Sequence, residues 1–443
     1  MDRFLNISTL FNHLLDRDLK DLSSVYSNLD KLGKVISETI GESLSSAQIK
    51  ERKILLKPNW VKHSSKITDD ICLRTNDNFL LAALEVILEK SPSSVIIGDA
   101  PIQGCRWNET VTEILSKKIH ELSKKYQIPV QIKDLRRATF SPLNNRLKTD
   151  LKPLSDYVIF NLKDKSYLEP ITSMERNRFR VTNYDPSKLV DSHKHGTHKY
   201  CVAKELFEAD VIISMPKIKT HQKSGITGAL KNIVGLNGDK DFLPHHRLGG
   251  TGFGGDCYPG KSYLRYCSEL ALDMANAKRG TVAYFLWTKV ASLFWRLSFP
   301  KDVHSLEAGW YGNDTTWRMV MDLNLIAFYG KPDGSLSDKR QRCIYSLCDG
   351  IIAGQGNGPL NPEPLPLGIV SFTDSPEIND IAMAILMGFD YRKLPLLTEA
   401  AKLLSTDDSK LFLNSKQISL FDLNEFSIKT NPPQGWKSYL LEE

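Results

Sequence analysis

The chain has 443 residues, of which 41% are hydrophobic and 25% charged, and its formal net charge is +6. This composition is that of a globular protein, and it excludes a disordered, collagen-like or disulfide-stapled chain. The small excess of positive charge comes without a long run of lysines or arginines. It therefore does not indicate nucleic-acid binding.

The cysteines and the first residues of the chain indicate its compartment. The seven cysteines are dispersed and form no C-x-x-C pair, so we expect no iron–sulfur cluster. Asp16, Arg17 and Asp18 stand where a signal peptide would need an apolar run. We therefore expect reduced thiols in a cytoplasmic protein.

Apolar runs alternate with amphipathic segments along most of the chain. The runs predict strands at 53–57, 94–99, 129–134, 157–162, 211–215, 342–348 and 368–372. Helices are expected within 1–50 and at 76–90, 109–125, 200–208, 261–278, 281–297, 315–329 and 374–388. This alternation predicts an α/β fold with mostly parallel sheets covered by helices, and a largely helical insertion after residue 260. The polar stretch 163–198 is expected to be a long loop.

These elements suggest four segments. Residues 1–50 form an N-terminal helical segment, and residues 51–260 an α/β domain with a basic site. Residues 261–335 form a helical region. Residues 336–443 form a C-terminal α/β segment that closes the cleft.

The most apolar stretch, 281–299, contains Lys289 and Arg296. Two internal cations make it a poor membrane span, so no transmembrane segment is expected. A buried amphipathic helix is the favoured interpretation. The alternative is an interfacial helix that makes weak contact with a membrane surface.

The segment 211–247 carries the densest polar pattern. It opens with a strand that ends at Pro216, and ligands of open α/β sheets bind beyond the carboxyl ends of strands. A glycine-containing turn then leads into a short helix, and residues 211–238 contain no carboxylate. Candidate ligand-binding residues here are Lys217, Lys219, Thr220, Gly225, Thr227, Gly228 and Asn232, with His221 and Lys231 as candidate catalytic residues.

This pattern is typical of an anion site. Glycines let backbone N–H groups approach a ligand, a helix N-terminus favours negative charge, and lysines add positive charge. Lys217 and Lys219 would share a face if the backbone is extended. The alternative is a solvated basic loop beside a capped helix.

Other polar residues stand near predicted strand ends. Asp99 ends a strand and could be a general base, a metal ligand or a helix cap. Asn357 lies in a glycine-rich turn that is expected to close the pocket. His245, His246 and Arg247 follow the basic segment. Arg247 is a candidate ligand-binding residue, and the histidines could bind a divalent metal, shuttle protons or be solvated.

A histidine cluster lies at 193–198. In an extended strand, His193 and His195 would face the same way, which is a geometry that zinc accepts. The alternative is a polar loop.

The order of several motifs resembles domain-of-unknown-function family 362. The central signature is Pro216 to His221 followed by Gly225 to Asn232. The motifs around Lys57 to Trp60, Gly98 to Pro101, Asp349 to Ile351 and Gly354 to Pro359 are also similar, so that the likeness spans about residues 50–395. The resemblance adds Lys57 and Asn59 to the candidate ligand-binding residues. Some members of the family carry ferredoxin-like cysteine clusters, which this sequence lacks.

A shorter likeness is to the nickel-pincer lactate racemases. The order His221, a small-residue turn and Lys231 is similar to theirs, although Ala229 stands in place of the second turn glycine. The resemblance implies that His221 transfers protons, that Lys231 anchors the cofactor and that His245 or His246 binds nickel. A second proton-transfer histidine is missing near Gly98 and Asp99.

Residues 255–262 fit the P-loop pattern literally, but no strand precedes them and Pro259 removes an N–H donor. Three functions therefore stay open. The first is an enzyme acting on an anionic carboxylate or phosphorylated metabolite, with isomerase- or epimerase-like acid–base chemistry. The second is a non-catalytic anion or metal-cofactor binding protein. The third is a nucleotide-dependent ligase or kinase.

Overall fold

A single large sheet runs through the computed structural model, which describes residues 3–11, 16–141, 151–175, 177–181, 183–298, 308–404 and 409–441. Its parallel centre has the order β13-β9-β2-β3-β4. These strands are β2 (Lys53–Pro58), β3 (Ser94–Asp99), β4 (Val130–Asp134), β9 (Val211–Met215) and β13 (Cys343–Gln355). The fold is α/β, as the alternating pattern predicted.

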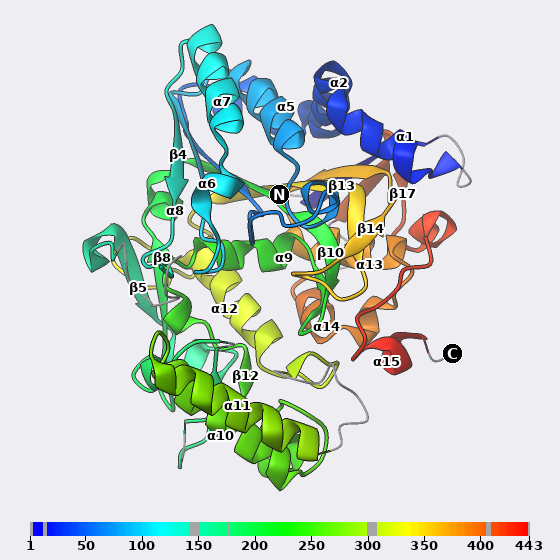
Figure 1. Cartoon of the computed structure of the whole chain (residues 1–443). Coiled ribbons are helices and arrows are strands. Elements are labelled where there is room, and N and C mark those ends of the chain that lie inside the picture. The colour runs from blue at the N-terminus through cyan, green and yellow to red at the C-terminus, as the bar shows by residue number, and fades with distance from the viewer. Residues whose placement is uncertain are drawn as a thin grey trace.

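Helices cover both faces of this sheet (Figure 1). One face carries α2 (Leu29–Ile40), α5 (Asp77–Leu88) and α7 (Glu113–Tyr126), whose apolar side chains share one buried cluster with the sheet. The other face carries α12 (Thr316–Tyr329) and α13 (Pro376–Leu386), which share a second cluster. Burial on both faces explains why the central strands read as continuous apolar runs.

The first described residues form a strand rather than a helix. β1 (Arg3–Thr9) lies antiparallel to β15 (Ile369–Thr373) and parallel to β16 (Ser409–Leu413). Its alternate residues Leu5 and Ile7 are buried, which is the period of a strand. The expectation of helix over the whole of 1–50 is therefore wrong for these residues.

Helices do follow β1 in that segment. They are α1 (Leu19–Ser24), α2 and α3 (Ser46–Ile49). The large sheet contains strands of both predicted segments, β2, β3, β4 and β9 from 51–260 and β13, β15 and β16 from 336–443. The division of the chain into four segments stays a prediction.

A small antiparallel sheet occupies part of the expected loop 163–198. It contains β5 (Tyr157–Asn161), β7 (His193–Lys194) and β8 (Thr197–Ala203). The helix expected over 200–208 is confined to α8 (Glu205–Glu208). The preceding residues pair with β5 because their aromatic and β-branched side chains fit a half-buried strand.

The helical insertion after residue 260 is confirmed. Helices α10 (Tyr263–Ala277) and α11 (Val282–Leu297) form a hairpin at the bottom of Figure 1. The buried positions of the two helices include small residues: Ala271 and Ala275 on α10, and Ala291 on α11. The Ser268 hydroxyl donates to the Ala291 carbonyl across the hairpin at 2.8 Å.

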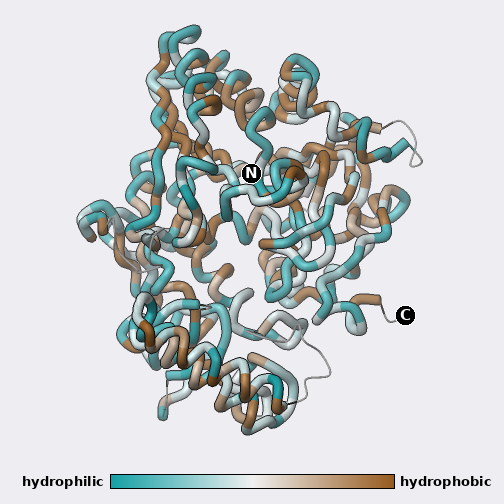
Figure 2. The backbone as a smooth tube through the Cα atoms, in the orientation of Figure 1, coloured by the Kyte–Doolittle hydropathy of each residue, from teal (hydrophilic) through white to brown (hydrophobic). Residues whose placement is uncertain are grey.

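The α11 helix is not the buried amphipathic helix that was expected. Within it, Ala291 is the residue that is buried, while Phe285 is 65% exposed and Leu293 is 55% exposed. Figure 2 shows apolar residues along this hairpin at the surface. Phe299 lies outside the described residues. None of the described helices is long and apolar enough to cross a membrane.

Candidate functional site

The predicted basic segment folds as a hairpin beyond the end of β9. β10 (Lys217–His221) pairs with β11 (Gly225–Thr227), in the register Lys219 with Thr227 and His221 with Gly225. Directly paired residues of an antiparallel ladder share a face, and so do alternate residues of a strand. One face of the hairpin therefore carries Lys217, Lys219, His221, Gly225 and Thr227.

Lys57 and Asp99 form a buried ion pair at the ends of β2 and β3. The Lys57 Nζ donates to Asp99 Oδ1 at 2.8 Å and to Asn232 Oδ1 at 3.1 Å. The other carboxylate oxygen of Asp99 accepts from the Trp60 N–H at 2.8 Å. Burial lowers the pKa of Lys57, and the Asp99 charge opposes this shift. Both groups are thus satisfied inside the protein.

Lys217 also finds a counter-ion, although none is near it in sequence. Its Nζ lies 2.9 Å from Asp349 Oδ2, which comes from β13, and donates to the Tyr26 hydroxyl at 2.8 Å. Tyr26 in turn donates to Asp349 Oδ1 at 2.5 Å. All three side chains are buried. This arrangement joins an N-terminal helical turn, β10 and β13.

Lys219 is buried without a carboxylate partner among the described residues. Its Nζ donates to Asn59 Oδ1 at 2.8 Å and to the Leu73 carbonyl. Burial, reinforced by the nearby Lys217 charge, lowers its pKa to about 7. Asn59 also donates to Asn232 Oδ1 at 3.2 Å, so Lys219 is linked to the network around Lys57.

Lys231 lies on the short helix α9 (Ala229–Asn232) and is partly exposed. No hydrogen bond or ion pair of its ammonium occurs within the described part of the chain. Burial and the charge of Lys223 lower its pKa to about 8. Thr227 is 4% exposed, and its hydroxyl oxygen is buried without a hydrogen-bond partner. Ammonium and hydroxyl are thus available to a ligand.

The hydrogen bonds of His221 determine which ring nitrogen carries its proton. Its Nδ1 accepts from the Lys223 backbone N–H at 3.0 Å. A backbone N–H can only donate, so the neutral ring carries its hydrogen on Nε2. Burial, followed by the charge of Lys231, holds the pKa of His221 well below its usual value. His221 is therefore a neutral hydrogen-bond donor at pH 7.

His245 has the opposite tautomer. Its Nδ1 lies 2.7 Å from the Leu243 carbonyl, which can only accept, so Nδ1 carries the hydrogen and Nε2 is an acceptor. The charge of His245 also lowers the pKa of His221. One ring thus offers a donor and the other an acceptor beside the same lysines.

The helix N-terminus that was expected to bind a ligand anion holds a carboxylate of the chain itself. Asp380, from α13, accepts from the Ala229 N–H at 2.6 Å and from the Leu230 N–H at 3.0 Å. A Cβ on Gly228 would lie 2.1 Å from its Oδ1, so glycine is needed for this approach. Burial raises the pKa of Asp380 to about 6. The ligand must therefore be sought on the lysine side of the hairpin.

Several predicted residues make other contacts. The Thr220 hydroxyl donates to the Gly356 carbonyl at 2.8 Å, and Asn357 Oδ1 accepts from the Gln434 N–H at 3.1 Å. These bonds fasten the 354–359 turn to β10 and to the C-terminal segment. Arg247 lines a different pocket. Their roles in ligand binding stay predictions.

The two adjacent histidines have different neighbours. His245 lies with His221 and Lys231, as described above. His246 lines a pocket beside α10 together with Cys257. That one of these two histidines binds a metal stays a prediction.

The 193–198 histidines form a closed network. His193 is buried, and its Nδ1 lies 3.3 Å from the Nδ1 of His198. His198 and His195 both contact the Glu169 carboxylate, at 2.9 Å and 2.6 Å. His193 pairs with His198 across β7 and β8. The residue that accompanies His193 is therefore His198, and not His195 as the sequence suggested.

The glycine-rich loop before α10 forms no phosphate cradle. The N–H groups of Thr251, Gly252 and Gly255 donate to carbonyls within the loop. The Gly260 N–H donates to the Thr251 hydroxyl at 2.8 Å. A P-loop needs these N–H groups free and a strand before them.

Sequence reasoning missed the partners that come from distant segments. Asp349, Tyr26 and Asp380 complete the ion pairs and the helix cap. Lys240, whose Nζ donates to the Ala100 carbonyl at 2.7 Å, adds a further buried lysine. A signal existed for Asp380, because the apolar run Ile381 to Leu386 follows it directly in the same helix.

The comparison with protein families bears on this hairpin. The family model described as Domain of unknown function (DUF362) matches residues 165–384. The chain resembles DUF362. This confirms the resemblance that the sequence motifs predicted. The DUF362 match contains β10, β11, α9 and Asp380, and it leaves out Lys57, Asn59 and Asp99.

Solved structures that resemble the chain include the following two, and no curated protein matches it. A crystal structure of a Thermotoga maritima protein has a TM-score of 0.36 at 11% identity, covering 85% of this chain and 58% of that one. A lactate racemase apoprotein from Thermoanaerobacterium thermosaccharolyticum has a TM-score of 0.29 at 11% identity, covering 72% and 48%. The chain thus spans about half to three-fifths of the length of these proteins.

Proposed function

We propose that the chain is an enzyme that binds an anionic small molecule, a carboxylate or a phosphorylated metabolite, beside the β10–β11 hairpin. The observation that carries this proposal is the state of Lys219 and Lys231. Lys219 is buried and Lys231 is partly exposed, and neither has a carboxylate partner among the described residues. Placing two such ammonium groups together is unfavourable unless an anion from solution joins them.

The groups around these lysines suit a hydroxy acid or a sugar acid. The lysines and the Thr227 hydroxyl would bind the carboxylate, and the unprotonated Nε2 of His245 would take the proton from the carbon beside it. His221 would then give its Nε2 proton to the other face of that carbon, while the lysines stabilise the negative charge that the carboxylate carries between the two transfers. Isomerisation or epimerisation is the reaction class that needs only these steps.

The two other functions have less support. A ligase or kinase needs a phosphate cradle, and N–H groups of the glycine-rich loop donate to carbonyls of the same loop. A carrier that binds the anion without chemistry would use the same lysines. It would not need one imidazole as a donor and another as an acceptor, and this favours the enzyme.

Solvent deuterium exchange tests the chemistry without a known product. The protein is incubated in D₂O with a panel of 2-hydroxy acids and sugar acids, and label at the acidic carbon is measured by mass spectrometry. We expect exchange with at least one compound. His221→Gln should lower its rate by about 10²–10⁴-fold, the size expected for losing a general acid.

The control for this variant is His120→Gln, which changes an exposed histidine on α7. It should leave exchange unchanged. If no compound exchanges, or if His221→Gln exchanges at the wild-type rate while still binding the anion, the carrier function replaces the enzyme.

The reduced state of the thiols supports a cytoplasmic location for this enzyme. All seven cysteines are free in the structure. Five of them are buried, where oxidation to disulfides would require the fold to open.

A second candidate function is weak binding to a membrane surface by the α10–α11 hairpin. Val282, Phe285 and Leu286 are 60–76% exposed, on one side of α11. The helix has no acidic residue, and Lys289 and Arg296 are exposed on it. Long cationic side chains at an apolar face can reach anionic lipid headgroups while the apolar residues enter the interface.

Vesicle sedimentation tests this contact. We expect binding to phosphatidylcholine vesicles that contain phosphatidylglycerol, and weaker binding to phosphatidylcholine alone. The double variant Phe285→Ser/Leu293→Ser should lose it. Ile67→Ser removes an exposed apolar residue elsewhere, at 95% exposure, and should leave vesicle binding unchanged. Equal binding of all three proteins, or no binding by the wild type, would reject the contact.

A further inference from the structure

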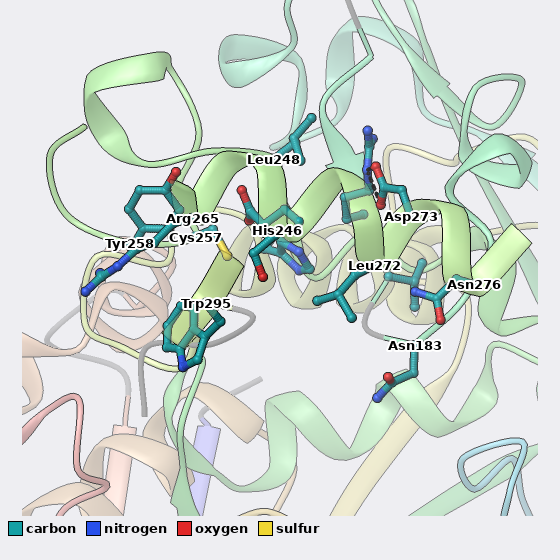
Figure 3. Close-up of a pocket in the computed structure, with 14 residues that line it drawn as sticks. Asn183, His246, Leu248, Cys257, Tyr258, Arg265, Leu272, Asp273, Asn276 and Trp295 are labelled. Atoms are coloured by element: carbon teal, nitrogen blue, oxygen red, sulfur yellow. Dashed lines mark hydrogen bonds and ion pairs between the residues drawn. The ribbon is translucent and has the colours of Figure 1, made fainter. Parts of the chain in front are cut away.

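A second group of polar side chains lies where α10 meets the segment after β12 (His246–Arg247). His246, Cys257 and Glu269 each offer one ligand atom, and these atoms lie within 4.8 Å of one another. The three residues line one pocket, and Figure 3 shows the sulfur of Cys257 beside His246. They are distinct from the lysines and the His221 ring of the proposed anion site.

One nitrogen in this group lacks a partner. His246 is 7% exposed, and its Nδ1 is buried without a hydrogen bond to the described residues. The Glu269 carboxylate contacts the Cys257 thiol, and its Oε2 accepts from the Gly249 N–H at 2.8 Å. Buried polar groups are nearly always satisfied, so the unpaired imidazole nitrogen beside a thiol and a carboxylate points to a ligand that the protein atoms do not supply.

The donor set identifies the ligand. An imidazole nitrogen, a thiol sulfur and a carboxylate oxygen together favour zinc-class ions, whereas magnesium and calcium prefer oxygen alone. Zinc bonds of 2.0–2.3 Å in a tetrahedron place neighbouring donors about 3.3–3.8 Å apart. The three atoms lie within 4.8 Å of one another, so the side chains must move closer together to hold the ion.

We propose that His246, Cys257 and Glu269 bind one Zn²⁺ ion through three protein ligands. The thiol proton leaves to solvent as the sulfur–zinc bond forms. The fourth position faces the pocket, where a water molecule completes the tetrahedron. Because Glu269 comes from α10 and the other ligands come from the preceding loop and strand, the ion ties the helical hairpin to the body of the protein.

Metal titration of the untagged chain tests this site. The chain is stripped with a chelator, and Zn²⁺ is added in competition with a chromophoric chelator. We expect one ion per chain. Cys257→Ser should weaken zinc binding by about 100-fold or more, since even the loss of an outer-shell contact can weaken it by about 10–100-fold. Cys267→Ser changes another free cysteine, on α10 and outside the cluster, and should bind zinc like the wild type.

Cobalt gives a second readout that does not depend on stability. Co²⁺ in this site should show a sulfur-to-cobalt charge-transfer absorption, which Cys257→Ser abolishes and Cys267→Ser retains. Glu269→Gln keeps the shape of the side chain, so it serves if Cys257→Ser fails to fold. Zinc should also raise the unfolding temperature of the wild type but not of either ligand variant.

Two results would overturn the proposal. One is the absence of zinc binding at micromolar concentration by the folded chain. The other is a cobalt spectrum or zinc affinity that Cys257→Ser and Glu269→Gln leave unchanged. The His221→Gln variant should bind zinc normally, so failure of the zinc site and failure of the proposed enzyme function are separate outcomes.

Discussion

Two pairs of lysines lie at the same edge of the sheet, and they differ in their partners. Lys57 and Lys217 each meet a buried carboxylate, Asp99 at 2.8 Å and Asp349 at 2.9 Å. Lys219 and Lys231 meet none in the described part of the chain. The first pair is complete within the protein. The second pair leaves positive charge that only a molecule from solution can balance, and this separates fold-stabilising lysines from candidate binding lysines.

The two kinds of lysine should differ most in how much they contribute to the free energy of unfolding. Removing one partner of a buried ion pair leaves the other charge unpaired in the interior. Asp349→Asn should therefore lower the free energy of unfolding by about 3–5 kcal/mol. Lys219→Met should change it little or raise it, because an unpaired buried charge is replaced by an apolar chain. Urea denaturation of both variants measures the difference, and an equal loss in both would place Lys219 with the structural lysines.

Anion affinity should show the reverse order. Lys219→Met and Lys231→Met should each weaken binding of the anionic compound by about 1–3 kcal/mol, since each removes a charge-assisted contact. Calorimetry with inorganic phosphate and with a panel of hydroxy acids measures this. Lys339→Met, at an exposed position, is the control and should bind normally. Unchanged affinity in both site variants would reject the site.

The same lysines predict how affinity depends on pH. Their pKa values of about 7 and about 8 mean that both are charged at about pH 6 and largely neutral at about pH 9. Affinity for carboxylates that carry no phosphate group should therefore fall as the pH rises from about 6 to about 9. The double variant Lys219→Met/Lys231→Met should flatten the profile. A profile that rises with pH would contradict the assignment.

The stability of the protein without ligand should depend on pH in the opposite direction to the affinity. The folded pKa of Lys219 lies below its value of 10.5 in an unfolded chain, so the unfolded state binds more protons between these two values. The contribution of Lys219 to stability should thus rise with pH above about 7. Comparing the slope of unfolding free energy against pH in the wild type and in Lys219→Met measures it.

The smallest effect concerns the carboxylate at helix α9. Asp380→Ala should lower stability by about 1–2 kcal/mol, the size of losing a helix cap. Gly228→Ala should be at least as damaging, because its methyl group would meet the Asp380 carboxylate. Thermal unfolding of both variants measures this. If Asp380→Ala instead abolished anion binding without loss of stability, Asp380 would belong to the ligand site.

The sequence predicted local features better than long-range pairings. The apolar runs located the central strands, and the glycine-containing basic segment located the hairpin with Lys219, His221 and Thr227. Partners could not be predicted, because a counter-ion such as Asp349 lies more than 100 residues away and nothing local specifies it. The strand at Arg3–Thr9 was missed because its short alternation lies before helical residues and its neighbours in the sheet come from the end of the chain.

The position of β1 has a consequence for the order in which the protein can be completed on the ribosome. This strand is synthesised before both of its neighbours in the sheet, residues 369–373 and 409–413. At about 5–20 residues per second, roughly 20–70 s of translation separate the strand from the first of these neighbours. During that interval Leu5 and Ile7 lack the strands that cover them in the finished sheet. The nascent chain must therefore shield this strand until its neighbours have been made.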